Sequence, residues 1–219
     1  MTNYHYWQYF LSLETDLITT SRYIEFTGRY VDNNNENKNN DETFSTELLR
    51  IFFAACAECE NIAKILAENN SQEKHINLPE LGKIIIQNPK YHGLQNRTIS
   101  CPAYSLDFTP WNTWNGTNEK GLPESPQWWK DHNDVKHGRE THYHKANLSN
   151  TLKSVAALIC LLFEYYKEKQ TEDENFIYYV VSFPPALATK LFITDISGLG
   201  FGNGAWCWPV KEEKRRRVQ

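Results

Sequence analysis

Apolar side chains recur every three or four positions along several stretches of the chain, which is the spacing of one face of an α-helix. In residues 4–30 the apolar positions are Trp7, Phe10, Leu11, Leu17, Ile18 and Ile24. A second stretch begins at Ser45, a good N-cap residue, with Phe44 placed to pack on Leu49, and runs to about Glu68. Its apolar positions are Leu48, Phe52, Ala55, Cys59, Ile62 and Leu66. Both stretches predict long amphipathic helices.

Two more long helices and one short helix follow the same reasoning. Ser125 and Pro126 predict the start of a third long helix, because serine caps helices and proline suits the first helical position. Gly138 is expected to break or bend it. A fourth helix is predicted over 144–169, where steps of four and three mark a core-facing stripe. That stripe is Leu148, Leu152, Val155, Ile159, Leu162 and Tyr166. A shorter helix is predicted over 79–87, with a proline in its first turn.

Two segments between the helices have no helical periodicity. Residues 31–42 are almost entirely asparagine and acid with nothing to bury, which predicts a mobile loop. Residues 94–127 contain several prolines and glycines together with Trp111 and Trp114. A segment this long is rarely featureless in a compact domain, so we expect an ordered irregular segment held over the helices by its aromatic residues.

The pattern changes near the C-terminus. Residues 176–183 are β-branched and aromatic and predict a strand, 191–196 predict a second strand, and the glycine-rich stretch 198–210 is turn-forming. The predicted fold class is therefore mainly α. An up-and-down bundle of four main helices occupies residues 1–170, and a small β-hairpin-like appendage with a basic tail follows over 171–219.

Composition limits the kinds of partner. The 219 residues are 40% hydrophobic, enough for a core, and the net charge of −4 provides no global attraction for nucleic acid. A polyanion would need a local basic patch, either Lys130, Lys136 and Arg139 or the tail 211–217. The start does not resemble a signal peptide, and we expect no transmembrane helix. The five cysteines show no compact disulfide framework, so a cytoplasmic protein without a membrane partner is the expectation.

The most reactive stretch is 128–144, which holds four of the seven histidines. An imidazole exchanges protons near neutral pH, because its unperturbed pKa is about 6.5. Asn133 and His137 are four positions apart and therefore share one helix face. A different stripe, Trp128, His132 and Val135, is expected to face the core. The helix is thus predicted to present Asn133 and His137 toward a cleft.

These residues carry a resemblance to the HEPN superfamily. Its motif is an arginine, a polar residue that is often asparagine, three further residues and a histidine, on the penultimate helix of an all-α bundle. Asn133 and His137 match that motif, and His132 stands at the arginine position. Residues 55–64 look like the acid-bearing helix of bacterial HEPN-like proteins, and the resemblance covers roughly residues 4–169. It implies a metal-independent endoribonuclease without cofactors, often in toxin or phage-defence settings, whose composite site forms in a homodimer.

The residues also suggest how RNA would be cleaved. A base that deprotonates the 2′-hydroxyl lets that oxygen attack phosphorus, which leaves a cyclic phosphate. His137 is the candidate base or acid, and Asn133 can orient the phosphate. Lys136 and Arg139 lie where they can offset the developing negative charge. Glu58, or alternatively Glu60, can hold a cation or histidine in place; the two lie about 200° apart on a helix, so only one is expected to face the site.

Further RNA contacts are predicted for Trp128, Trp129, Lys130 and His132, because exposed aromatic rings stack on unpaired bases and cations meet phosphates. The alternative for the tryptophans is a packing lid over the bundle. For His137 the alternative is an ordinary histidine at a helix end, and for the two cations a solvated helix face. The histidines lack the spacing and cysteine partners typical of a zinc site, so no metal site is predicted.

Different functions remain open from the sequence. The first is the HEPN-type endoribonuclease, supported by Asn133, His137 and the nearby cations. The second is a catalytically inactive HEPN-like scaffold or partner-binding subunit of a defence or toxin–antitoxin complex, which the absent arginine favours. A third is a small-molecule-binding bundle that uses the tryptophan-rich segment as a lid.

Overall fold

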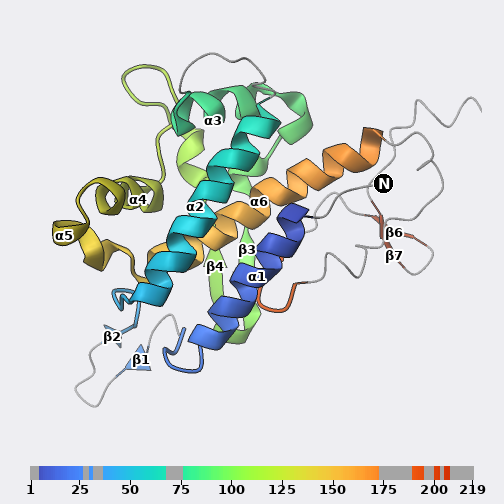
Figure 1. Cartoon of the computed structure of the whole chain (residues 1–219). Coiled ribbons are helices and arrows are strands. Elements are labelled where there is room, and N and C mark those ends of the chain that lie inside the picture. The colour runs from blue at the N-terminus through green and yellow to red at the C-terminus, as the bar shows by residue number, and fades with distance from the viewer. Residues whose placement is uncertain are drawn as a thin grey trace, which may run out of the picture.

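The computed structural model describes residues 5–26, 30–31, 37–67, 76–172, 189–194, 200–202 and 205–207. Helices make up most of it (Figure 1). The α-helices are α1 (His5–Thr20), α2 (Thr46–Leu66), α3 (Leu78–Gln87), α4 (Gln127–His137), α5 (Arg139–His142) and α6 (Leu148–Glu172). The mainly α class predicted from the sequence is confirmed, whereas the four-helix HEPN arrangement stays a proposal.

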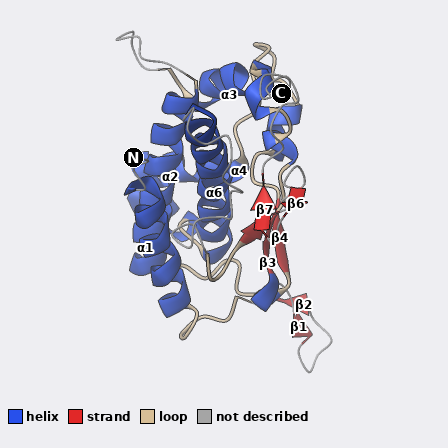
Figure 2. Ribbon diagram, turned by 90° about the vertical axis from the view of Figure 1, so that its right-hand side faces the viewer, coloured by secondary structure: helices blue, strands red, loops and turns tan. Residues whose placement is uncertain are grey.

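Short strands and 3-10 turns connect these helices. The strands are β1 (Tyr30–Val31), β2 (Asn37–Lys38), β3 (Ile99–Cys101), β4 (Leu106–Phe108), β5 (Ile193–Thr194), β6 (Gly200–Gly202) and β7 (Ala205–Cys207). The 3-10 turns are η1 (Pro89–Tyr91), η2 (Leu94–Asn96), η3 (Pro102–Tyr104), η4 (Asn112–Asn115) and η5 (Tyr143–Lys145). All strand pairs are antiparallel, and β3 lies between β4 and β5. Figure 2 shows β3 beside β4.

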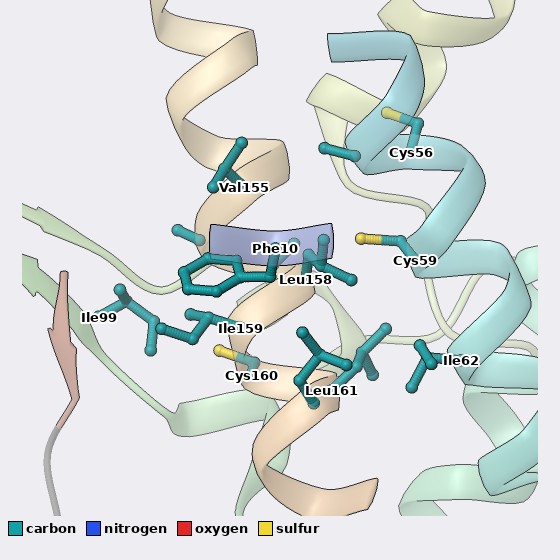
Figure 3. Packing of buried hydrophobic residues seen from close by; sticks show 14 of the residues in the cluster. Phe10, Cys56, Cys59, Ile62, Ile99, Val155, Leu158, Ile159, Cys160 and Leu161 are labelled. Carbon is teal, nitrogen blue, oxygen red and sulfur yellow. The ribbon is translucent and has the colours of Figure 1, made fainter. Parts of the chain in front are cut away.

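Helix α6 is the centre of the core. Every residue from Ser154 to Glu164 is buried, and α2 packs along it (Figure 1). Figure 3 shows Cys56, Cys59 and Ile62 of α2 facing leucines of α6, with Phe10 of α1 and Ile99 of β3 in the same cluster. The stripe predicted from the sequence, Leu148, Leu152, Val155, Ile159, Leu162 and Tyr166, is buried, which confirms it. The helix begins at Leu148 rather than at residue 144.

The stretch Leu148–Glu168 of α6 is also long and apolar enough to cross a membrane, judged by length and composition. Within the fold 83% of that window is buried. A buried core helix passes the same test, and α1, α2, α4 and η2 all pack on α6.

The helix ends follow local hydrogen bonding. Ser45 caps α2 as predicted, with its Oγ accepting from the Leu48 amide at 3.1 Å. Phe44 packs edge-on against Tyr143, with ring centroids 5.6 Å apart. Helix α1 stops at Thr20 and does not reach residue 30, so that predicted end is wrong. Hydroxyl side chains near its end donate to backbone carbonyls of the preceding turn, as Thr20 does to the Asp16 carbonyl at 2.8 Å. Such side-chain hydrogen bonds compete with the backbone hydrogen bonds of a regular helix.

The segment 94–127 is ordered and held by tryptophans, as predicted. Trp111 is fully buried, and its indole N–H donates to the Ala157 carbonyl of α6 at 3.1 Å. Trp114 is buried beside it, with ring centroids 4.3 Å apart. The segment also contains the β3–β4 hairpin, which the sequence pattern did not indicate; Ser105, with a φ of 54°, takes the left-handed conformation at its turn.

Residues 189–194 contribute to the main core. Strand β5 pairs with β3 inside the predicted second strand, and Leu191 and Phe192 are buried. The buried carboxylate of Glu14 on α1 accepts hydrogen bonds from the backbone amides of residues 190–192. Residues 189–194 therefore belong with the helices, although the sequence assigns them to an appendage. The predicted strand 176–183 lies outside the described residues.

The predicted mobile loop 31–42 is structured where it is described. Residues 30–31 pair with residues 37–38. Further along, the Asn40 amide donates to the Glu25 carbonyl at 2.9 Å, and the Ser149 amide donates to the Asp41 carbonyl at 3.1 Å. Polar side chains and carbonyls thus tie this segment to the start of α6, which a reading based on hydrophobicity alone misses.

Candidate functional site

Helix α4 carries the candidate residues and ends where the sequence predicts. Its C-cap is Gly138, after which the chain turns into α5. Its N-cap is Pro126 without a side-chain hydrogen bond, so the prediction that Ser125 caps the helix is wrong. The side of α4 formed by Trp128, His132 and Val135 is buried, which confirms the predicted core stripe.

A polar network fixes α4 against the start of α6. The Lys145 ammonium lies 2.6 Å from an Asp134 oxygen and 3.0 Å from an Asp131 oxygen. The Asn150 amide nitrogen donates to Asp131 at 3.1 Å, and Gln127 donates to the other Asp131 oxygen at 3.1 Å. The bond from Lys145 lowers the pKa of Asp134 and raises that of Lys145. The network holds the orientation of α4. Within it, only the bond from Gln127 to Asp131 has the i, i+4 spacing that a helical sequence pattern can indicate, whereas Lys145 and Asn150 reach α4 from later in the chain.

The outer side of α4 brings together most of the predicted catalytic residues. Asn133 is half-buried, and Lys136, His137 and Arg139 are exposed around it. Among the residues that the structure describes, the His137 imidazole forms no hydrogen bond or ion pair. The Arg139 guanidinium stands over the Phe53 ring of α2, 5.5 Å from its centroid, so its direction is fixed by a cation–π contact. The result is an accessible imidazole with an amide and two cations nearby.

His132, at the position of the motif arginine, is buried, unlike the exposed residues of the outer side of α4. It is 5% exposed, and the rings of Phe53, Trp129 and Phe52 surround it at centroid distances of 4.9, 5.1 and 5.8 Å. Burial lowers the pKa of His132 to about 4, and the neighbouring charges of Lys136 and His137 act in the same direction. Its Nδ1 atom has no partner among the described residues. At neutral pH His132 is therefore an uncharged ring, so it does not replace the positive charge of an arginine.

The tryptophans predicted to stack on RNA bases are packed inside the protein. Trp128 is 3% exposed and Trp129 is 7% exposed, and their rings pack edge-on with centroids 5.9 Å apart. The Trp128 indole donates to the Pro110 carbonyl at 3.1 Å. A ring with both faces covered has no surface on which a base can stack, so the packing alternative holds for these two residues. Of the four predicted RNA contacts, Lys130 alone is exposed, since His132 is buried as well.

The acid on α2 that faces α4 is Glu60. The negative charge of Glu60 raises the pKa of His132, although burial lowers that pKa by more. Glu60 therefore lies near the α4 site. It also pairs with Lys64 at 2.6 Å. Glu58, the acid predicted to support catalysis, is half-buried and acts electrostatically on Cys59 instead. The 200° separation expected from the helix explains why only one of the two acids can serve this site.

Metal ligands do not gather in the described part of the chain. No group of three or more histidine, cysteine or acidic side chains lies close enough there to hold a metal ion. Cys56 and Cys59 are fully buried free thiols, and burial raises the pKa of both. They pack in the core as small apolar residues.

No protein-family model, curated protein or solved structure matches this chain.

Proposed function

We propose that this protein is a metal-independent endoribonuclease of the HEPN type, which cleaves RNA through attack of the 2′-hydroxyl and leaves a cyclic phosphate. One observation carries the proposal. His137 and Asn133 lie one helical turn apart on the accessible side of α4, with Lys136 and Arg139 beside them and no competing partner for the imidazole in the described residues.

Each residue has a defined role in the proposed reaction. His137 takes the proton of the 2′-hydroxyl as that oxygen forms its bond to phosphorus. The bond from phosphorus to the 5′-oxygen then breaks, and the leaving oxygen takes up a proton from a water molecule. The side-chain amide of Asn133 donates a hydrogen bond to a phosphate oxygen and orients it. No metal ion takes part in these steps.

The positive charge that stabilises the phosphorane comes from residues other than the arginine of the family motif. Because His132 is buried and uncharged, Lys136 and Arg139 are the cations available to stabilise the phosphorane. Arg139 is already directed by its contact with Phe53, whereas Lys136 is exposed and makes no ion pair with a described residue. Lys130, one turn before Asn133, adds a charge for the neighbouring phosphate.

The proposal includes a homodimer, because HEPN-type sites form where two bundles meet. It also places the protein in the cytoplasm, in a toxin or anti-phage defence setting, with RNA as its main partner. An exposed imidazole on an open helix surface, rather than in an enclosed cleft, is compatible with a site that a second copy completes.

A second candidate function is favoured by His132 itself. A neutral ring locked in an aromatic cage at the arginine position fits a catalytically inactive HEPN-like scaffold that binds a partner protein of a defence or toxin–antitoxin complex. In that case the α4 surface would bind without cleaving.

RNA cleavage in EDTA separates the two functions. The wild type is compared with His137→Ala and Asn133→Ala, and with His144→Ala as the matched control, because His144 is an exposed histidine outside α4. We expect cleavage by the wild type and the control, a loss of about 100-fold or more for His137→Ala, and a smaller loss for Asn133→Ala. Intact RNA with all four proteins supports the scaffold. Cleavage that stops in EDTA contradicts the metal-free reaction.

A further inference from the structure

A pocket that the sequence did not indicate opens at the other end of α4. It lies where β4 and η4 meet the starts of α4 and α6, and its volume is about 340 Å³. That volume is at the lower end of the range found for small-molecule sites. The pocket is lined by residues 107–110, 112–113 and 126–128, and by Asn150 and Lys153. Three separate segments of the chain therefore shape it.

Flat apolar groups form the walls of this pocket. Phe108 of β4 is half-buried, and Trp128 is held in place by its indole hydrogen bond to Pro110. Pro110 and Pro126 complete the apolar lining. Among these groups Phe108 is the partly exposed ring, so it is the one that can offer a flat face to a thin ligand, whereas Trp128 is 3% exposed.

Two of the polar residues that line the pocket, Asn150 and Lys153, lie on α6. The Asn150 amide nitrogen is committed to two acceptors, an Asp131 oxygen at 3.1 Å and the Lys145 carbonyl at 2.9 Å. These two acceptors fix the orientation of the amide, so its Oδ1 is the atom left to accept a bond from a ligand. Lys153, one turn later, makes no hydrogen bond or ion pair with any described residue and can donate one.

The charges of the lining decide what kind of ring fits. Lys153 is the cation and Asp107 the acid among the lining residues, and Asp107 is bonded to the Ser100 hydroxyl. The two charges offset each other, so the pocket does not favour a phosphate or another anion. An uncharged planar ring with an N–H donor next to an acceptor matches Asn150 and Lys153. A nucleobase has this pattern on its edge.

We propose that this pocket holds one unpaired base of a single-stranded RNA, flat against Phe108 and with its polar edge toward Asn150 and Lys153. The identity of the ligand as RNA rests on the proposed function. The pocket at residues 126–128 and His137 are about ten residues apart on one helix, or about 15 Å along its axis, which a few nucleotides can span. The base would then set where along the strand cleavage occurs.

Binding of uncleavable oligonucleotides tests the pocket separately from catalysis. The probes are a 2′-O-methyl decamer of uridine, which lacks the attacking hydroxyl, and a decamer of equal charge without bases, both measured by fluorescence anisotropy. We expect the decamer with bases to bind about tenfold more tightly or better, because stacking of a base is worth about 1–3 kcal/mol. Equal affinity for the two decamers, or binding of neither, overturns the inference.

Two variants and one control locate that difference. Phe108→Leu keeps an apolar side chain of similar size but removes the aromatic face, and it should abolish most of the preference for the decamer with bases. Lys153→Gln should weaken binding of that decamer about threefold or more. Lys83→Gln, an exposed lysine on α3, should change nothing. A preference that persists unchanged in both pocket variants refutes the assignment.

The cleavage assay keeps the two ideas distinguishable. Cleavage of natural RNA that depends on His137, with no preference for bases in the decamer assay, supports the proposed function and overturns the pocket inference. Preference for bases that depends on Phe108, without any cleavage, supports the pocket and removes the endoribonuclease.

Discussion

The buried imidazole of His132 should make the stability of this protein depend on pH. Its ring is surrounded by Phe52, Phe53 and Trp129, and its Nδ1 has no partner among the described residues. Burial lowers the pKa of His132 from 6.5 to about 4, and the charged groups around it are Lys136, His137 and Glu60. The informative perturbation is His132→Leu, which keeps an apolar side chain in the cage and removes the titrating group.

The sign of the effect follows from which state binds the proton. The unfolded chain protonates His132 below a pH of about 6.5, whereas the folded protein does so only near pH 4. Between these values the unfolded state binds more protons, so the free energy of unfolding falls as the pH falls. A shift of roughly 2.5 pKa units corresponds to about 3 kcal/mol over the whole window. Between pH 7 and pH 5 the loss is about 2 kcal/mol.

Urea denaturation at pH 7 and pH 5 measures this loss. The wild type should lose about 2 kcal/mol more than His132→Leu between the two pH values. His144→Leu, which replaces an exposed histidine, should keep the pH dependence of the wild type. If His132→Leu loses as much stability as the wild type, then His132 is not held uncharged by burial, and the argument that it cannot replace an arginine fails.

Two further predictions concern packing. A Cβ atom on Gly82 would lie 2.8 Å from the Trp114 ring. Gly82→Ala should therefore lower the free energy of unfolding, measured in urea, by about 1–2 kcal/mol, because overpacking outweighs the gain in helix propensity. The control Lys83→Ala, at an exposed position on the same helix, should be nearly neutral. Glu14→Gln should cost roughly 2 kcal/mol and speed amide exchange at residues 190–192, whose amides the carboxylate holds; unchanged exchange there would contradict this role.

Periodicity in the sequence predicted the elements whose stability comes from one buried face. The stripe of α6 and the Ser45 cap of α2 are local patterns, and both are found in the structure. The end of α1 was misplaced by ten residues because apolar spacing continues beyond Thr20, while hydroxyl side chains there bond to the preceding turn. The β3–β4 hairpin escaped prediction because three-residue strands are too short for a pattern.

The candidate site shows the same division between local and tertiary information. Helical spacing placed Asn133 and His137 on one side of α4 and Trp128 and His132 on the other. It did not reveal that the cage around His132 closes with Phe53 of α2, because that contact joins residues far apart in the chain. The pocket beside Phe108 arises in the same way, from three segments of the chain whose meeting depends on the tertiary fold.

The chemistry of the cut ends tests the central claim most directly. Purified protein is incubated with a labelled RNA in EDTA, and the termini of the products are identified by mass spectrometry for the wild type and for His137→Ala. The account predicts cyclic-phosphate and 5′-hydroxyl ends that the wild type makes and the variant does not. Products with 5′-phosphate ends, or equal cleavage by both proteins, would contradict the role given to His137.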